Sequence, residues 1–248
     1  MEIAAYSGMA AAENRHWWFA GRRLIVAGFM RRLKLPATAR VLELGCGSGG
    51  NLAMLAEFGQ LTAVEPHAGA RNRAIARGVG RGLAGRLPDP VPRVAASFDA
   101  VVMLDVLEHV ADDAGALATA MRMLKPGGRL LLTVPAFPFL WSRHDELTHH
   151  FRRYRRQKLA RLLKDGGFAL ERLTHFNTLL FPAIAAFRLL QRLRRDDSDE
   201  DAGLAVPAPP INGALKAILA AEALALPVLN LPFGVSLLAV ARKPERRA

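Results

Sequence analysis

The sequence predicts an α/β fold built on a doubly wound, mostly parallel sheet. Two observations lead to this fold class. Apolar strand-like runs alternate with helical segments over residues 40–134, an alternation that is typical of parallel sheets. In addition, a glycine-rich loop follows the first of these runs, and the second ends in the carboxylate Glu65, which is the layout of a nucleotide-type cofactor site in such sheets.

Each predicted element has a local reason. Residues 1–35 form a helical cap because their large apolar side chains recur close to helical spacing until Pro36. Three prolines make residues 79–96 irregular. The predicted strands are 40–44, 61–65, 98–104, 129–134, 168–176 and 235–240. The helices between them are 49–58, 68–77, 112–124 and 157–165, and loops at 135–140 and 144–154 lie at the carboxyl edge of the sheet.

A long insertion separates the last two predicted strands. It contains an apolar helix at 178–195, an acidic and then proline-rich linker at 196–210, and a second apolar helix at 214–229. Charged residues or prolines interrupt both helices, so neither has the run of about 20 apolar residues that a bilayer span requires. Two interpretations stay open. The helices pack on the core and on each other, or they form a lid or membrane-surface patch whose flanking arginines contact lipid headgroups.

Composition limits the classes of protein and partner. The apolar fraction of 51% suffices for one domain with an insertion. The net charge of +12 attracts polyanions, either anionic lipid or nucleic acid, unless it is only a solvated surface. Aromatic residues do not interleave with the basic runs, so nucleic acid is the weaker partner. A single cysteine and the lack of a signal-peptide pattern lead us to expect a cytoplasmic protein, with peripheral contact to the inner face of the membrane through the insertion.

Glu43, two residues before the first glycine of the loop, indicates which class of cofactor the loop binds. Gly45, Gly47 and Gly50 fit the G-x-G-x-x-G pattern of dinucleotide binders, which is weak evidence alone. A carboxylate at this loop would face a pyrophosphate at close range, and each like-charge pair at about 4 Å costs on the order of 4 kcal/mol. The same carboxylate suits a cationic ligand without phosphate, such as S-adenosylmethionine (SAM). Glu65 would then accept the ribose hydroxyls.

At these residues the chain resembles the class I SAM-dependent methyltransferases, in the bacterial small-molecule branch similar to types 11 and 12. The resemblance is carried by residues 13–23, 40–52, 97–110, 124–135 and 149–168. It implies a Rossmann-like core with a seven-stranded sheet and an antiparallel last strand, here 235–240. The four parts of the chain are then a helical cap (1–35), the SAM-binding core (36–177), the helical insertion (178–232), and the final strand with a basic tail (233–248).

The resemblance also implies which residues hold the cofactor. The loop residues and their carboxylates are Glu43, Gly45, Cys46, Gly47, Gly49 and Glu65. Many relatives place an aspartate at the adenine after the third strand, but this chain has Ala84 to Pro88 there, so apolar contact near Leu87 replaces it. Leu104 and Asp105 border the transferable methyl group. Trp18 and Arg22 either cap the pocket or belong to a plain amphipathic helix.

Two groups of residues are candidates for the catalytic base. The first contains Asp105, Glu108 and His109 in the spacing D-x-x-E-H, which is similar to an E-x-x-E-H metal motif of some ubiquinone-pathway O-methyltransferases. Because similar sequences occur in relatives without metal, we predict no metal ligand. The second group includes His149 and His150 in the loop 144–154, since a neutral histidine suits deprotonation of a hydroxyl. Arg152 and Arg153 beside them suit a phosphate or carboxylate of the substrate.

The sequence therefore predicts a SAM-dependent methyltransferase that O-methylates an apolar or lipid-linked small molecule. Two alternatives remain. One is methylation of RNA or protein by the basic surface, and the other is a SAM-binding scaffold without turnover.

Overall fold

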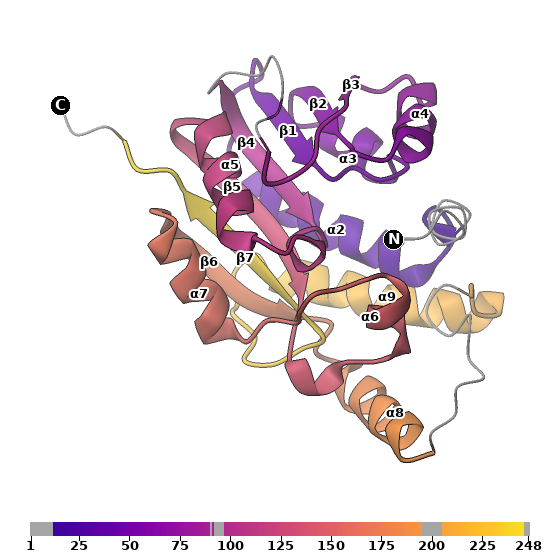
Figure 1. Cartoon of the computed structure of the whole chain (residues 1–248). Helices are drawn as coiled ribbons and strands as arrows, with labels where there is room; N and C mark the ends of the chain where they lie inside the picture. The colour runs from indigo at the N-terminus through magenta and orange to yellow at the C-terminus, as the bar shows by residue number, and fades with distance from the viewer. Residues whose placement is uncertain (1–11, 90, 92–96, 195–204, 246–248) are drawn as a thin grey trace.

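The computed structural model describes residues 12–89, 91, 97–194 and 205–245. Its centre is one seven-stranded sheet with the order β3-β2-β1-β4-β5-β7-β6 (Figure 1). Only β7 runs antiparallel to its neighbours, so the predicted fold class is confirmed. The strands are β1 (Arg40–Leu44), β2 (Gln60–Val64), β3 (Arg81–Leu83), β4 (Phe98–Leu104), β5 (Leu124–Pro135), β6 (Ala169–Phe176) and β7 (Ser236–Arg242).

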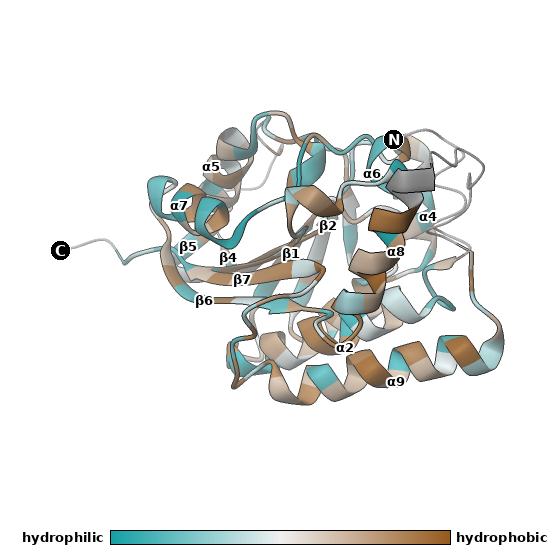
Figure 2. Cartoon of the chain, turned by 90° about the horizontal axis from the view of Figure 1, so that it is seen from below, coloured by the Kyte–Doolittle hydropathy of each residue, from teal (hydrophilic) through white to brown (hydrophobic). Residues whose placement is uncertain are grey.

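The central strands are apolar along most of their length because helices cover both faces of the sheet. In β1, Val41 packs into the cluster on one face, and Leu42 and Leu44 pack into the cluster on the other. Figure 2 shows α5 (Asp113–Met123) and α7 (Arg156–Asp165) on one side of the sheet, with α2 (Trp17–Arg32) and α9 (Pro209–Ala225) on the opposite side. The result is a three-layer sandwich of helix, sheet and helix.

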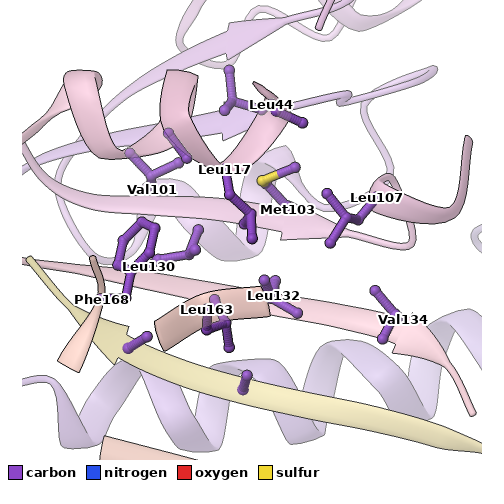
Figure 3. Packing of buried hydrophobic residues seen from close by; sticks show 14 of the residues in the cluster. Leu44, Val101, Met103, Leu107, Leu117, Leu130, Leu132, Val134, Leu163 and Phe168 are labelled. Carbon is purple, nitrogen blue, oxygen red and sulfur yellow. The ribbon is translucent and has the colours of Figure 1, made fainter. Parts of the chain in front are cut away.

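The first face of the sheet packs against α5 and α7. Figure 3 shows Leu117 of α5 and Leu163 of α7 directed at Met103 and Leu132 of the sheet. All four side chains have no exposed surface. Burial of such a leucine is worth about 2 kcal/mol, so this layer holds the ends of β4 and β5 rigidly.

The second face is covered by α2, by α3 (Leu52–Ala56) and α4 (Ala68–Ala76), and by α9 from the insertion. The α2–α9 contact is close at Gly21, where an added Cβ would lie 2.5 Å from the side chain of Leu219. Leu219 of α9 and Leu226, which directly follows the helix, are fully buried in the same cluster. The second insertion helix therefore packs on the core. No described helix is both long and apolar enough to cross a membrane.

The other insertion helix, α8 (Phe181–Arg194), lies against the loop after β5 and extends away from the sheet (Figure 1). Arg188 of α8 donates to the carbonyl of Leu140 at 2.7 Å. Phe187, Leu189 and Leu190 are each about half exposed. This helix keeps an apolar surface that no described element covers.

Several predicted boundaries differ from the structure. A third strand, β3, lies inside the stretch 79–96 that was predicted to be irregular, because it pairs with the edge of β2 before the prolines begin. The predicted loop 144–154 contains a short helix, α6 (Arg143–Leu147), which begins at a capping box between Ser142 and Asp145. Helix α9 begins at Pro209, within the predicted linker, since proline suits the first helical turn. The predictions for residues 1–11, 195–204 and 246–248 concern parts of the chain outside the described residues.

Candidate functional site

The glycine loop follows β1 at the carboxyl edge of the sheet. Gly45 and Gly49 have φ values of +76° and +88°, which side chains other than glycine rarely adopt. A Cβ on Gly45 would also lie 2.6 Å from Val106 in the loop after β4. The amides of Gly45 and Cys46 both donate to the carbonyl of Val64 in β2. The loop is thus fixed between β1, β2 and β4. Burial raises the pKa of the Cys46 thiol, so it stays neutral and serves packing.

Glu43 is a buried carboxylate, and only one of its two oxygens accepts a hydrogen bond from the described residues. Asn51 donates to its Oε1 at 2.9 Å, while Oε2 is buried and has no hydrogen-bond partner among the described residues. Burial raises the pKa of Glu43 to about 7, although the hydrogen bond from Asn51 opposes this shift. An unpartnered buried carboxylate oxygen is suited to a cationic group, because a cation supplies the charge compensation that burial removed.

Glu65 follows β2 and lies beside the same loop. Its Oε2 accepts from the amide of Gly47, and its Oε1 accepts from the amide of His67, both at 2.9 Å. The structure therefore brings together Glu65 and the glycine loop, as the sequence predicted. Leu87 follows β3, is half-buried and packs against the first core cluster, and its predicted contact with the adenine stays a prediction.

Asp105 directly follows β4, has a φ of +53°, and is held from two sides. Thr133 of β5 donates to its Oδ1 at 2.9 Å, and Arg22 of α2 forms an ion pair with its Oδ2. Leu104 precedes it and is buried. Arg22 is buried as well, and in the part of the chain that the structure describes its Nε has no hydrogen-bond partner. The N-terminal helix thus contributes a buried guanidinium to the end of β4.

Trp18 lies one helical turn before Arg22, and its ring stacks on Phe176 at the end of β6 with centroids 5.6 Å apart. The structure thus places Trp18 at the β6 end of the carboxyl edge, where its predicted contact with the cofactor stays a prediction.

A polar network that the sequence analysis missed joins the cap to the glycine loop. Glu13 accepts a hydrogen bond from Ser48 at 2.9 Å and forms an ion pair with Arg77 at the end of α4. Arg23 donates to the carbonyl of Glu13 at 2.8 Å. No local pattern connects Glu13 with Ser48 or Arg77, because their pairing depends on the tertiary position of the cap.

A second cluster lies beside Asp105, in the segment after β4. Glu108 and His109 belong to a single 3₁₀ turn, and the ring of His150 lies 4.5 Å from that of His109 between centroids. The amide of Phe151 donates to the carbonyl of Glu108 at 2.8 Å, which ties the two loops together. We refer to Glu108, His109 and His150 as the His–Glu cluster.

The two predicted histidines of the loop 144–154 differ in their surroundings. His150 points inward to the His–Glu cluster, whereas His149 is exposed and has a φ of +55°. His144 also lies near His150, with centroids 6.0 Å apart. Burial, followed by the proximity of His150, lowers the pKa of both His109 and His144 to about 4. The geometry favours His150 over His149 as a residue of the site.

Asp145 is a fully buried carboxylate that positions His150. Its Oδ1 contacts Nδ1 of His150 at 2.7 Å and accepts from Arg153 at 2.8 Å. Its Oδ2 accepts from the amide of Ser142. Burial alone would raise the pKa of Asp145, but the bond to His150 and the Arg153 guanidinium hold it well below its usual range.

The predicted role of Arg152 and Arg153 in binding a substrate anion needs correction. Arg153 is buried and occupied by Asp145 and by the carbonyl of Ala136. Arg152 forms an ion pair with Asp113 at 2.6 Å. Both guanidinium groups therefore have carboxylate partners within the chain, and they hold the loop 144–154 in place.

Aromatic side chains line the other half of the carboxyl edge. Phe137 and Phe139 follow β5, Phe181 begins α8, and Phe233 precedes β7. Their ring centroids lie 5.3 to 6.5 Å apart along a continuous chain of contacts. Phe137 also stacks on His175 of β6 at 5.1 Å. We call the four phenylalanines the aromatic cluster.

Comparison with known proteins gives a family and several relatives. The family described as "Methyltransferase domain" matches residues 16–173. The Ubiquinone biosynthesis O-methyltransferase of Xanthomonas axonopodis pv. citri is 33% identical over 155 residues, covering 55% of this chain and 65% of that protein. The "Probable S-adenosylmethionine-dependent methyltransferase" of Mycolicibacterium smegmatis is 30% identical over 170 residues, covering 65% and 62%. The chain thus spans less than two thirds of the length of these relatives.

A solved structure shows the same fold. The geranyl diphosphate C-methyltransferase from Streptomyces coelicolor, in complex with Mg²⁺, geranyl diphosphate and S-adenosyl-L-homocysteine, superposes with a TM-score of 0.59 at 15% identity. The superposition covers 87% of this chain and 78% of the other. Since the family match extends over residues 16–173, more than half of the sequence, the chain belongs to the methyltransferase-domain family, the class I SAM-dependent methyltransferases, whose cofactor is S-adenosylmethionine.

Proposed function

We propose that this chain transfers the methyl group of SAM to an oxygen atom of an apolar or lipid-linked small molecule. The observation that carries this proposal is the juxtaposition at one sheet edge of a cradle for a cationic ligand, at the ends of β1 and β2, with the His–Glu cluster at the end of β4. In open α/β sheets, ligands bind at this edge.

The cofactor would be held by two carboxylates that differ in their hydrogen bonds: Glu43 has one oxygen without a partner among the described residues, whereas both oxygens of Glu65 accept from backbone amides. The free oxygen of Glu43 would bind the α-ammonium group, and Glu65 would bind the ribose. The Arg22 guanidinium, whose Nε lacks a partner, is suited to the carboxylate of the cofactor. When bound, SAM supplies an electrophilic methyl group on a sulfonium, and the protein's own contribution is alignment and exclusion of water.

The acceptor half supports an apolar substrate. The aromatic cluster joins the loop after β5 to the start of α8, and Arg188 of α8 donates to Leu140 in the same loop. The relative from Xanthomonas is named as an O-methyltransferase, which supports oxygen as the nucleophile. A hydroxyl acceptor must lose its proton, and His150, with its Nδ1 held by Asp145, is placed to direct its other nitrogen at that proton. A peripheral contact with an anionic membrane would bring lipid-linked acceptors to α8.

Glu43 gives a pH dependence that tests the cofactor half. We expect the affinity for SAM to fall about tenfold per pH unit below about pH 7, because protonated Glu43 no longer attracts the ammonium group. The SAM amine stays protonated over this range. Folding of the free protein takes up a proton at Glu43, so its stability falls as pH rises from 4.5 to about 7. Glu43→Gln should bind SAM weakly and without this pH dependence, as measured by calorimetry. A pH-independent wild-type affinity would contradict the assignment.

The acceptor is tested by transfer of radiolabelled methyl groups from SAM. Purified protein is incubated separately with a bacterial lipid extract, with total RNA and with a protein extract. Label in the lipid fraction that resists amide and ester hydrolysis supports ether formation on a lipid-linked hydroxyl. Label in RNA or protein would favour the alternative substrates. SAM binding with no label in any fraction would favour a scaffold that lacks turnover.

A further inference from the structure

We infer that His175 is a specificity-determining residue of the acceptor site, whose Nε2 accepts a hydrogen bond from a hydroxyl or N–H group of the substrate. The apolar acceptor would carry this group in addition to the oxygen that is methylated. The inference rests on the proposed function, because it places the acceptor beside the aromatic cluster. It adds one polar recognition point to a surface that phenylalanine rings otherwise form.

His175 lies at the carboxyl edge of the sheet, one residue before the end of β6. Its ring stacks on Phe137 with centroids 5.1 Å apart and an interplanar angle of 9°. Phe137 in turn contacts Phe139 and Phe181. Phe181 contacts Phe233. His175 is only 2% exposed, whereas Phe139 and Phe233 are 46% and 42% exposed. The aromatic cluster therefore has an exposed outer end and a polar inner end at His175.

Only one ring nitrogen of His175 has a hydrogen-bond partner among the described residues. Its Nδ1 lies 3.3 Å from the carbonyl oxygen of Leu231. Because a carbonyl can only accept, Nδ1 carries the proton of the neutral ring and Nε2 presents a lone pair. Burial lowers the pKa of His175, although the bond to Leu231 opposes this shift, so the ring is neutral near pH 7. The Nε2 atom is buried and is the nitrogen without a partner.

This Nε2 atom is the observation that points to a ligand group. Buried polar atoms in native structures nearly always have a partner, and a lone pair can be paired only by a donor. A wholly apolar molecule on the aromatic cluster would leave Nε2 unpaired, and an ether or a carboxylate would do the same. A hydroxyl or N–H group supplies the donor. Rotation of the exposed rings of Phe139 and Phe233 would open a path to it, since rotamer changes at binding surfaces are common.

Arg153 joins the aromatic cluster to the residues proposed to act on the acceptor. Its guanidinium donates to Asp145, the carboxylate that contacts His150. It also donates at 3.1 Å to the carbonyl of Ala136, which immediately precedes Phe137. One buried side chain therefore ties the inner end of the aromatic cluster to the loop 144–154. The proposed base and the proposed recognition point are thus neighbours along one edge of the sheet.

The inference is tested with 2-naphthol and 2-methylnaphthalene, which share a ring system and differ little in size, although only the first can donate a hydrogen bond. Their affinities are measured by equilibrium dialysis on protein saturated with S-adenosylhomocysteine, so that no methyl transfer occurs. We expect wild type to bind 2-naphthol about tenfold more tightly or better. His175→Phe keeps a ring on Phe137 but lacks the lone pair, so it should bind 2-methylnaphthalene at least as tightly as 2-naphthol. His149→Ala is the control and should keep the wild-type preference.

Nitrogen NMR of protein labelled at histidine provides a second readout that does not need a folded variant with an altered core. The resonance of the unprotonated Nε2 of His175 should shift when 2-naphthol is added and stay in place with 2-methylnaphthalene. Its assignment follows from its loss in His175→Gln. Because glutamine keeps an acceptor oxygen at the end of its side chain, this variant should retain part of the preference for 2-naphthol.

Three results would overturn the inference: an unchanged preference in His175→Phe, an Nε2 resonance that 2-naphthol does not shift, or no binding of 2-naphthol to wild type. The proposed function is measured on the same samples, by SAM affinity and by transfer of label to the lipid extract. Label transfer by wild type together with an unshifted Nε2 resonance rejects only the role of His175. The expected naphthol preference without transfer of label to any fraction rejects the proposed function.

Discussion

Replacing Asp145 by asparagine is expected to lower the free energy of unfolding by about 3–5 kcal/mol, which would be the largest loss of stability from a single polar substitution in the site. The carboxylate is fully buried and accepts from Arg153 and Ser142 while contacting His150. Arg153 is itself only 3% exposed, so the substitution leaves a buried guanidinium without its counter-charge. An asparagine can accept at one atom only, and its amide group would face a donor.

Glu146→Gln is a matched control for this experiment, because it removes the neighbouring carboxylate. Glu146 forms an ion pair with Arg143 at 3.8 Å, and both side chains are about half exposed. Pairs of this kind contribute about 0–1 kcal/mol, so its unfolding midpoint in urea should stay close to that of wild type. If Asp145→Asn unfolds at the same urea concentration as Glu146→Gln, the loop 144–154 is not held by the buried pair.

The second large effect is expected at His150. His150→Ala should lower kcat for methyl transfer by about 100-fold or more, the typical loss when a group that deprotonates the acceptor is removed. The affinity for SAM should change little, since Glu43 and Glu65, the residues proposed to hold the cofactor, lie at the ends of other strands. The measurement is the single-turnover rate on the acceptor identified from the labelled fractions, with SAM saturating.

His149→Ala tests which of two adjacent histidines acts. His149 is exposed at the surface of the loop, whereas His150 faces His109 across 4.5 Å. We therefore expect the His149 variant to retain a rate within about twofold of wild type. A strong loss in His149→Ala together with a normal rate in His150→Ala would contradict the assignment of the base.

The geometry of the proposed cofactor half of the site was predictable from sequence because it is local. Glu43, Gly45 and Gly47 lie within one strand–loop–helix unit, whose geometry is dictated by apolar alternation and positive φ values. Glu65 was predictable because the next parallel strand must end at the same edge. The structure brings these residues together by hydrogen bonds and burial, as the spacing indicated.

The geometry of the proposed catalytic half was harder to predict, since it depends on contacts between distant loops. Sequence could not separate His149 from His150, because a change of direction at one residue decides which side chain faces inward. Arg152 and Arg153 resemble an anion site in sequence, yet Asp113 and Asp145 occupy them. Residue identity alone does not reveal whether a charge already has a partner.

The cap illustrates the same limit. Its helix was predictable from spacing, but its ties to the core were not. Arg22 meets Asp105 and Glu13 meets Ser48 only after the cap packs on the second face of the sheet. The insertion also divides in a way that composition does not indicate: α9 packs on α2 through the buried Leu219, while α8 contacts the loop after β5.

The central claim, a SAM site formed by the glycine loop and its carboxylates, is tested most directly by calorimetric titration with SAM, S-adenosylhomocysteine and NADH on wild type and Glu65→Ala. We expect micromolar binding of both SAM-type ligands to wild type, loss of that binding in the variant, and no binding of NADH. Tight binding of NADH without binding of SAM would contradict the assignment of Glu43 and the mechanism that depends on it.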